Sequence, residues 1–544
     1  MTENLTLTEF PPVSTAEWNA AVLKDQKGVA PKTKLYYRAE DLRGLEYLDS
    51  APGDFPYTRG TRAGNDWSIR ETVHDAAAAQ DALDGGADEI CFVLGGQEID
   101  KVLDSLPLDR CAVHFEAGER AVEALEALIR RPVRGSIDYE PLADFERAAQ
   151  FIRAAYTPEF KPVTVRAHRF TEAGAATVQE LALALAEGVE MLARIPDVAP
   201  AMLFSFAVGP LYFLEIAKLR AARTLWARVV ESFGGDPQSA RMTVCARTAH
   251  WTKTVYSAHV NMLRATTAAM AAAIGGADAL QVEPFDDTYR APGETSRRLA
   301  RNTQLILKRE ALLDRVADAA GGSYYLENLT DSLAKEAWAL FQQIEAAGGF
   351  LDYSASGQLE RDLAKSRLDR EAAVGTRRTT ILGTNQYPNP AARMLQEIKR
   401  ADSAARPARI FEEIRLRTER YADRTGRTPQ FLLLEAGDPK MRKARSGFIA
   451  NFFGCGGFDC RISDTLSGDP DAVVLCSSDP EYAALAPRVI QDLRDAGKAT
   501  PVIVAGNPVD SMEQLKQAGV AGFVHVRSNA AEVLRSWQDR LGVK

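Results

Sequence analysis

Short apolar runs alternate with longer amphipathic stretches through most of the chain. Eight such runs precede residue 284, at 66–72, 88–94, 111–116, 133–138, 163–168, 202–207, 242–246 and 279–283. The stretches between them have the spacing of amphipathic helices, as at 121–129. Parallel strands need helical crossovers and are buried on both faces. The pattern therefore predicts an α/β fold, a (β/α)8 TIM barrel over residues 61–385, with a further helix at 332–347 packed outside it.

The same alternation returns near the C-terminus. Five apolar runs lie at 431–435, 458–462, 472–476, 501–505 and 521–526. Five strands with helices between them are typical of a doubly wound, flavodoxin-like (Rossmann-like) domain, which we place at 428–544. Only a short polar loop separates the second and third of these strands. We therefore expect the crossover between them to lack a full helix.

Two further segments do not show this alternation of apolar runs and amphipathic stretches. Residues 1–60 are expected to form an N-terminal arm, in which Ser14 and Glu17 have the spacing of a helix cap and proline-, glycine- and tyrosine-rich chain follows. Such an arm is expected to wrap a partner or its own barrel. Residues 386–427 are polar, contain prolines and are dense in charge, and we interpret them as a linker.

Composition excludes several classes of function. The chain has 544 residues, of which 74 are acidic and 66 basic, for a net charge of −8. This balance lacks the basic surface of a nucleic-acid-binding protein. No apolar run is long enough for a membrane span and no signal-peptide pattern begins the chain, so we expect a cytoplasmic protein. The six cysteines include no Cys-x-x-Cys pair and fit small core residues better than a metal site.

Four segments resemble a known family. They are 57–60 (Tyr-Thr-Arg-Gly), 172–175 (Glu-Ala-Gly-Ala), 216–223 (Ile-Ala-Lys-Leu-Arg-Ala-Ala-Arg) and 318–325 (Asp-Ala-Ala-Gly-Gly-Ser-Tyr-Tyr). With the predicted order of domains, they resemble the adenosylcobalamin-dependent acyl-CoA mutases, and methylmalonyl-CoA mutase most closely. In that family the cobalt–carbon bond breaks homolytically, and the radical abstracts hydrogen from an acyl-CoA threaded through the barrel. The resemblance implies that the protein supplies cobalt ligation, substrate positioning and exclusion of water.

The resemblance fails at the cobalt ligand. The family carries Asp-x-His-x-x-Gly where its cobalamin-binding domain begins. An ungapped alignment anchored on 450–460 puts Lys440 at the aspartate, Arg442 at the histidine and Arg445 at the glycine. A guanidinium has no lone pair to give a metal, and a large side chain at the glycine position would narrow the groove for the cofactor's nucleotide tail. Met441 fits a structural methionine better than a ligand.

Two further loops of this domain differ from the family. Members have Ser-x-Leu after the third strand and Gly-Gly after the fourth. This chain has Ser477-Ser478-Asp479 and Ala505-Gly506 instead, so one of the two sites is half retained. We therefore expect a degenerate cobalamin-binding-type domain without a cofactor.

The barrel shows similar losses. An alignment on 172–175 puts the family's active-site histidine at Arg169 and the neighbouring tyrosine at His168, and a one-residue shift would return His168 to the catalytic position. The segment after Gly60 is shorter than in the family and lacks the tyrosine that guards the radical. We therefore assign no catalytic, cofactor-binding or metal residue to this chain.

Other polar residues follow barrel strands, where the catalytic groups of barrels lie. They are His114, Glu116, Asp138, Glu140, His250, Trp251, Glu283 and Asp286. We interpret Glu283 and Asp286 as caps or solvated groups, Trp251 as packing and His250 as a hydrogen-bonding group. Whether the first four converge as an acid–base pair stays open. The glycines at 95–96 and 454–457 lack the spacing of a phosphate cradle and predict turns.

Several members of the family are heterodimers of a catalytic large subunit and a homologous small subunit that has lost its sites, and this chain resembles that small subunit. The resemblance implies a large-subunit partner that carries adenosylcobalamin and interconverts (R)-methylmalonyl-CoA and succinyl-CoA, with equivalent surfaces meeting across a pseudo-two-fold axis. An alternative is an acyl-CoA-binding barrel with cobalamin-independent chemistry through His168 and Glu283. A third makes the C-terminal domain a sensor for another ligand.

Overall fold

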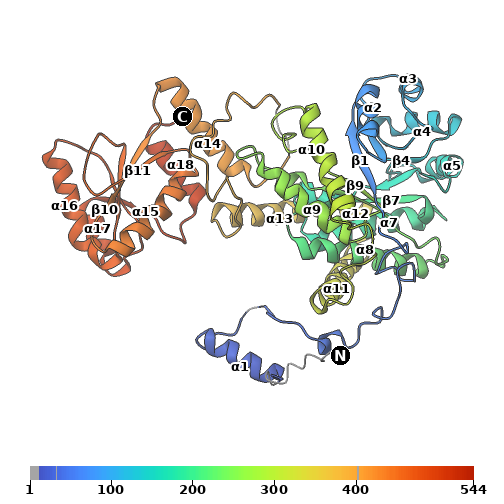
Figure 1. The fold of residues 1–544 in the computed structure, drawn as a ribbon, viewed down its shortest axis with the longest axis horizontal. Coiled ribbons are helices and arrows are strands. Elements are labelled where there is room, and N and C mark those ends of the chain that lie inside the picture. The colour runs from blue at the N-terminus through green and yellow to red at the C-terminus, as the bar shows by residue number, and fades with distance from the viewer. Residues whose placement is uncertain (1–11, 32, 196, 401–403) are drawn as a thin grey trace, which may run out of the picture.

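The computed structural model describes residues 12–31, 33–195, 197–400 and 404–544. Figure 1 shows an N-terminal arm in blue, a central barrel with its covering helices, and a C-terminal α/β domain in orange and red. In the arm, helix α1 (Thr15–Asp25) is capped by Ser14 as predicted, and the 3-10 helix η1 (Ala39–Leu42) follows. Residues 1–11 of the predicted arm lie outside the described residues.

The central sheet closes into the predicted parallel barrel. Its strands run in the order β5-β4-β3-β2-β1-β9-β8-β7-β6. They are β1 (Ser68–Val73), β2 (Glu89–Val93), β3 (Ala112–Glu116), β4 (Gly135–Ile137), β5 (Phe160–Lys161), β6 (Val163–Val165), β7 (Met202–Val208), β8 (Thr243–Thr248) and β9 (Ala279–Gln281). β5 and β6 are two halves of one strand, interrupted at Pro162, which has no N–H to donate to the sheet. Counted as one, they complete a ring of eight strands.

Helices cover the outside of this ring. Those after successive strands are α2 (Ala76–Asp84), α3 (Ile99–Ser105), α4 (Ala121–Arg130), α5 (Phe145–Ala155), α6 (His168–Ala173), α7 (Thr177–Arg194), α8 (Tyr212–Ser232), α9 (Val260–Ile274) and α10 (Glu294–Leu305). The chain continues through the π-helical turn η5 (Ile306–Glu310) into α11 (Tyr324–Ala346), α12 (Gly349–Ala355) and α13 (Gln358–Gly375). Short 3-10 turns are η2 (Gly118–Arg120), η3 (Ala199–Ala201) and η4 (His250–Thr252). The helix expected at 332–347 is most of α11, which packs on α7 and α8.

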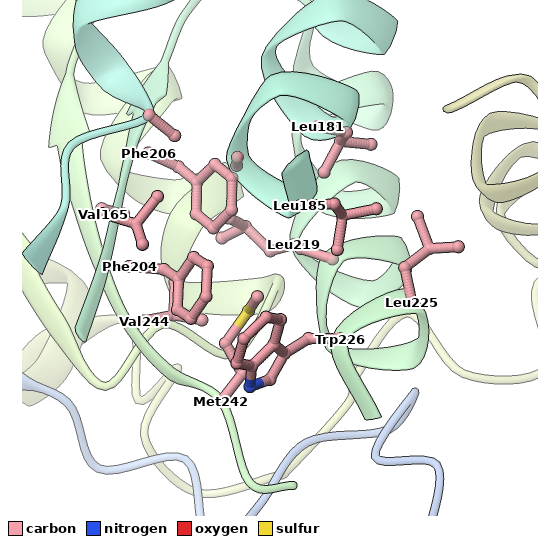
Figure 2. Packing of buried hydrophobic residues seen from close by; sticks show 14 of the residues in the cluster. Val165, Leu181, Leu185, Phe204, Phe206, Leu219, Leu225, Trp226, Met242 and Val244 are labelled. Atoms are coloured by element: carbon pink, nitrogen blue, oxygen red, sulfur yellow. The ribbon is translucent and has the colours of Figure 1, made fainter. Parts of the chain in front are cut away.

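The apolar core lies between strands and helices rather than inside the barrel. On β7, Phe204 and Phe206 point outward, and the Phe204 ring lies 4.8 Å from the Trp226 ring of α8 (Figure 2). Successive strand residues point to opposite faces, so Ser205 between them faces the barrel axis. The apolar runs located the strands but did not reveal this polar inward face.

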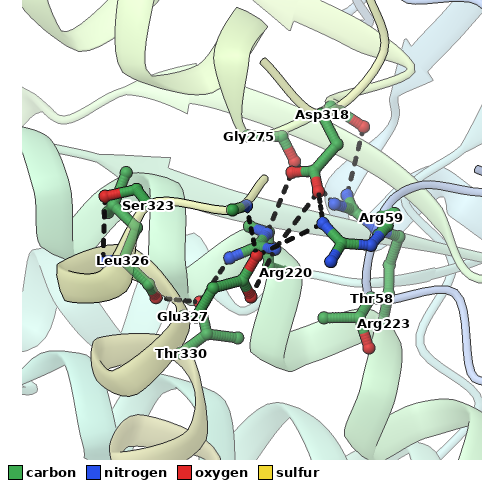
Figure 3. A network of polar contacts seen from close by, with 12 residues as sticks. Thr58, Arg59, Arg220, Arg223, Gly275, Asp318, Ser323, Leu326, Glu327 and Thr330 are labelled. Carbon is green, nitrogen blue, oxygen red and sulfur yellow. Dashed lines mark hydrogen bonds and ion pairs between the residues drawn. The ribbon is translucent and has the colours of Figure 1, made fainter. Parts of the chain in front are cut away.

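Three of the four segments that carry the family resemblance meet in one buried ion network (Figure 3). Arg59 of the arm lies 2.8 Å from Asp318 and 3.2 Å from Glu327. Arg220 of α8 reaches the same two carboxylates at 3.0 Å and 2.9 Å. Glu327 lies on α11 and also accepts the Gly322 N–H at 2.8 Å. The network joins the end of the arm to α8 and α11. Three segments that lie far apart in the sequence are therefore in contact in the folded chain.

The C-terminal domain contains a five-stranded parallel sheet in the order β11-β10-β12-β13-β14. Its elements are β10 (Gln430–Glu435), α15 (Pro439–Gly454), β11 (Asp459–Ser463), β12 (Ala472–Cys476), η6 (Asp479–Glu481), α16 (Tyr482–Asp495), β13 (Val502–Val504), η7 (Val509–Ser511), α17 (Met512–Ala518), β14 (Val520–Phe523) and α18 (Ala530–Arg540). Alternate strand residues pack against α15 and α18 on one face and against α16 and α17 on the other. The loop 464–471 contains no helix, which confirms the shortened crossover.

Helix α14 (Arg409–Thr425) occupies much of the segment 386–427 that we interpreted as a linker. It buries Phe411 and Ile414 in the C-terminal core. It also contacts the barrel, because Glu412 accepts the Val255 N–H at 2.7 Å. The sequence analysis missed α14 because its remaining positions are dense in charge. Residues 401–403 of this segment lie outside the described residues.

Among the helices of the described residues, none combines the length and the apolar character that a membrane crossing requires.

Candidate functional site

Two cavities lie one above the other along the barrel axis. The mouth cavity, about 400 Å³, opens at the carboxyl ends of the strands, the face on which TIM barrels carry their sites. The inner cavity, about 80 Å³, is lined by Arg70, His114, Glu116, Asp138, Thr164, Arg166, His168, Leu203, Ser205, Cys245, Arg247 and Gln281. Polar and charged groups thus surround the barrel axis below the mouth.

Arg247 forms a bridge across the barrel between these cavities. It lies on β8, and its Nη1 is 2.5 Å from Glu116 Oε1 on β3. β3 and β8 face each other across the ring of strands. Glu283, just past β9, pairs with the same guanidinium at 3.2 Å. The bridge lies between the two cavities, and both of its residues line both of them.

His168, and not Arg169, faces the cavities. The His168 ring lines both of them, with Nδ1 3.4 Å from the Ser205 carbonyl oxygen. Burial, together with the nearby Arg247 and Arg166, lowers the pKa of His168, so its imidazole is neutral. Arg169 points elsewhere and pairs with Glu140 and, at 2.9 Å, with Glu187. Of the two residues that the alternative alignments offered for the family's histidine, His168 is the one that lines the cavities.

Glu172 is a functional candidate that the sequence analysis named only as part of a motif. Its carboxylate lines the mouth cavity and accepts the backbone N–H groups of His250 and Trp251 at 2.6 and 2.8 Å. Burial raises the pKa of Glu172 to about 7, although these N–H groups oppose the shift. The available signal was the position of Glu172 in the short helix α6, which begins soon after the barrel strand β6 ends.

The remaining barrel candidates do not form one acid–base pair. His114 shares a hydrogen bond of 2.6 Å with Ser136, and Asp138 accepts the Ala117 N–H at 2.8 Å. Burial raises the pKa of Asp138 to about 6. Glu140 pairs with Arg166 at 2.7 Å, and Asp286 pairs with Arg290 at 2.7 Å. Their partners are cations, a backbone N–H group and the Ser136 hydroxyl of this chain.

One cysteine lies among groups that could bind a metal. The ligand atoms of Cys91, His114 and Glu116 are all within 4.8 Å of one another. Arg247 already pairs with Glu116, and Arg70 and Arg247 both lower the pKa of His114 after burial itself. The positive charges of Arg70 and Arg247 therefore disfavour a bound metal cation at this place. Of the six cysteines, all free, only Cys460 is not fully buried.

The carboxyl edge of the C-terminal sheet carries the residues that the sequence alignment put at the family's cobalamin positions. α15 begins there and carries Lys440, which is exposed, and Arg442, whose Nε lies 3.9 Å from Glu435. Arg445 on the same helix pairs with Asp479 at 3.1 Å. These are cations at the edge where open α/β sheets bind their ligands.

The other two loops of this edge are tightly packed. Ser477 is buried, and its hydroxyl donates to Glu481 at 2.6 Å. Ala505 is also buried, and a Cβ on Gly506 would lie 2.4 Å from an Asp479 carboxylate oxygen. Gly506 is the residue that leaves this site half retained in the sequence, and the space beside it is filled.

His525 is the one histidine of the C-terminal domain, and the sequence analysis did not consider it. It follows β14, and its Nδ1 accepts the Arg527 N–H at 3.2 Å. Partial burial, Arg527 and Arg445 lower the pKa of its imidazole. Two arginines beside the ring make this a poor place for a metal cation.

Comparison with known proteins identifies the architecture. A profile of the methylmalonyl-CoA mutase family matches residues 125–430. The methylmalonyl-CoA mutase small subunit of Porphyromonas gingivalis is 35% identical over 99% of this chain and 98% of its own length. This chain belongs to the methylmalonyl-CoA mutase family. The small subunit of Streptomyces virginiae is 33% identical over 98% of both chains.

Relatives that carry the undivided family name align as well. A methylmalonyl-CoA mutase of Cereibacter sphaeroides is 28% identical over 92% of this chain and 95% of its own length. This match therefore extends over both the barrel and the C-terminal α/β domain of this chain.

Proposed function

We propose that this chain is the non-catalytic small subunit of a heterodimeric methylmalonyl-CoA mutase. It supports a homologous large subunit that carries adenosylcobalamin and interconverts (R)-methylmalonyl-CoA and succinyl-CoA by a radical 1,2-rearrangement. The observation that carries the proposal is the set of cations on α15, Lys440, Arg442 and Arg445, where the family holds its cobalt ligand. The strand order of the C-terminal sheet supports a flavodoxin-like, cobalamin-binding-type domain that has lost its ligand.

The donor set at this edge does not fit a cobalt ion. Cobalt needs a neutral nitrogen with a free lone pair, and its histidine ligand needs a hydrogen-bond acceptor to orient the ring. Arg442 has no lone pair to give, and Lys440, at the orienting position, carries donors only. The groups present repel a metal cation. We therefore place the cofactor on the large subunit.

The barrel supports the same proposal. Family members thread an acyl-CoA along the barrel axis, which requires an open channel. In this chain the pair of Arg247 and Glu116 crosses the axis and is held on its other side by Glu283. This ion pair is partly buried, and opening it would leave charges without their partners. Substrate positioning therefore also belongs to the partner.

The names of its relatives as small subunits favour a large-subunit partner. The arm offers a surface for it, because no residue of α1 is buried and Val13, Val29 and Leu35 are each more than half exposed. We propose that the arm lies on the large subunit.

The proposal is tested by purifying the chain alone and together with the large subunit. The isolated chain should retain no corrinoid absorbance after gel filtration and should have no mutase turnover, whereas the complex should have both. Corrinoid retention or isomerisation by the isolated wild-type chain would defeat the proposal.

A second candidate is an acyl-CoA-binding barrel with cobalamin-independent chemistry. The mouth cavity favours it, since neutral His168 and the raised pKa of Glu172 put a base and an acid in one space of about 400 Å³. This reading predicts that acyl-CoA esters raise the melting temperature of the isolated chain. No shift at millimolar ester concentration would exclude it.

A further inference from the structure

Open α/β sheets bind their ligands in the crevice at the carboxyl ends of the strands, where the strand order reverses. In the C-terminal domain the order reverses between β10 and β12. The loops after β10, β12 and β13 border this crevice. Side chains of the chain itself occupy it.

Glu481 ties the loop after β10 to the loop after β12. Its carboxylate accepts the hydroxyls of Ser477 and Ser478, each at 2.6 Å, and the Asp438 N–H at 3.1 Å. The hydroxyl groups of Ser477 and Ser478 lower the pKa of Glu481 to about 2, so the group stays charged. A Cβ on Gly437 would lie 2.5 Å from the same carboxylate, so the first loop closes directly onto it.

Tyr482 fills the space between the loops after β12 and β13. Its side chain is fully buried, and its hydroxyl lies 2.7 Å from the carbonyl oxygens of both Ser477 and Ala505. The same oxygen accepts the Ser477 N–H at 3.0 Å. A Cβ on Gly506 would lie 3.0 Å from the tyrosine ring. The Tyr482 hydroxyl therefore joins the ends of β12 and β13 through its contacts with three backbone groups.

We propose that Glu481 and Tyr482 are permanent occupants of this crevice. The carboxylate takes the place of a ligand's anionic group, and the phenol takes the place of its ring. The domain is complete without any bound molecule, and the missing cobalt ligand is not the only obstacle to a corrinoid. This inference rests on the proposed function and adds to it that restoring Asp-x-His-x-x-Gly alone will not restore binding.

The first experiment removes the phenol and returns it from solution. Tyr482→Ala should lower the melting temperature by on the order of 10 °C and leave a cavity that added phenol fills. Phenol should bind this variant roughly tenfold more tightly than benzene, because only phenol remakes the hydrogen bonds. Tyr482→Phe keeps the ring and should respond to neither molecule.

Phe453→Ala is the matched control. Phe453 is fully buried against the opposite face of the same sheet, in an apolar cluster. Its cavity should therefore prefer benzene to phenol. Equal responses of the Tyr482→Ala and Phe453→Ala variants to the two molecules would overturn the assignment of Tyr482 as a hydrogen-bonded occupant.

The second experiment uses hydroxocobalamin and gel filtration. Lys440→Asp/Arg442→His/Arg445→Gly should retain as little corrinoid as the wild-type chain. Adding Glu481→Ala and Tyr482→Ala should raise retention roughly tenfold. Tight retention by the first variant, or none by the second when it melts cooperatively, counts against the occupants, whereas retention by the wild type counts against the proposed function itself.

Discussion

At the scale of single residues, the charges inside the barrel are set by their neighbours. Arg247 is held by Glu116 and Glu283, and burial together with this arginine lowers the pKa of His168. Burial also raises the pKa of a carboxyl group that forms no ion pair with the described residues, as at Glu172. The type of a residue alone therefore does not determine the pKa or the partners of its side chain.

Arg247→Leu should destabilise the chain by about 1–3 kcal/mol, because two partly buried carboxylates lose their shared cation. The free energy of unfolding in urea measures the effect. Arg228→Ala is the control, since Arg228 pairs with Glu231 on the surface and its loss should cost no more than about 0.5 kcal/mol. Similar losses for both variants would show that the bridge is not a structural pair.

Glu172 should make stability fall as pH rises. Burial raises its pKa from 4.5 to about 7 in the folded state. Between these values the folded chain holds a proton that the unfolded chain has released, so the free energy of unfolding decreases with increasing pH. Glu172→Gln should flatten this slope between about pH 5 and 7.

Glu123→Gln is the control for that slope. Glu123 is exposed, and its hydrogen bond with Arg120 lowers its pKa, so it does not titrate in this window. If Glu172→Gln leaves the pH dependence as it is in the wild type, the carboxyl group of Glu172 is already ionised at neutral pH.

At the scale of elements, α14 connects two domains that the strand pattern treats as separate. Glu419 on this helix accepts the Tyr256 hydroxyl at 2.8 Å and the N–H groups of Met394 and Leu395, each at 2.9 Å. It thus fixes the barrel loop after β8 and the connecting chain at once. α8 and α11 are joined in the same way by the network of Arg220.

Glu419→Ala should loosen the contact between the domains, because it leaves three donors without their acceptor. Such a loss costs about 1–3 kcal/mol per buried group. We expect faster hydrogen exchange of the Met394 and Leu395 amides and faster proteolysis within 386–400. Glu413→Ala on the exposed side of the same helix should change neither, and equal protection in both variants would contradict this role of Glu419.

At the scale of the whole molecule, α1 is a part of the arm that is little tied to the barrel, since none of its residues is buried. α1 contacts the arm's own chain, through Thr15 with Glu40 at 2.6 Å and Trp18 with Tyr36 at 5.5 Å between rings. Figure 1 shows it standing away from the barrel helices. The effect of α1 on the stability of the fold can therefore be measured separately from its effect on partner binding.

Deleting residues 1–31 should leave the melting temperature of the isolated chain unchanged, since α1 buries no residue. Binding to the large subunit, measured by titration calorimetry, should weaken by roughly tenfold or more, because aromatic side chains such as Trp18 often dominate interfaces. A lower melting temperature of the deletion variant would contradict this prediction, and so would an unchanged affinity for the large subunit. Either result would indicate that the arm packs on this chain itself.

The sequence by itself determined the barrel, the C-terminal sheet, its shortened crossover and the family, because these follow from the spacing of apolar residues and from short local motifs. It also drew attention to Lys440, Arg442 and Arg445, since the type of a residue is visible in the sequence. Only the tertiary structure decided what faces the barrel axis. The pairing of Arg247 with Glu116 and the contacts of Tyr482 join segments far apart in the chain, and burial, which shifts the pKa of Glu172, exists only once those segments are packed.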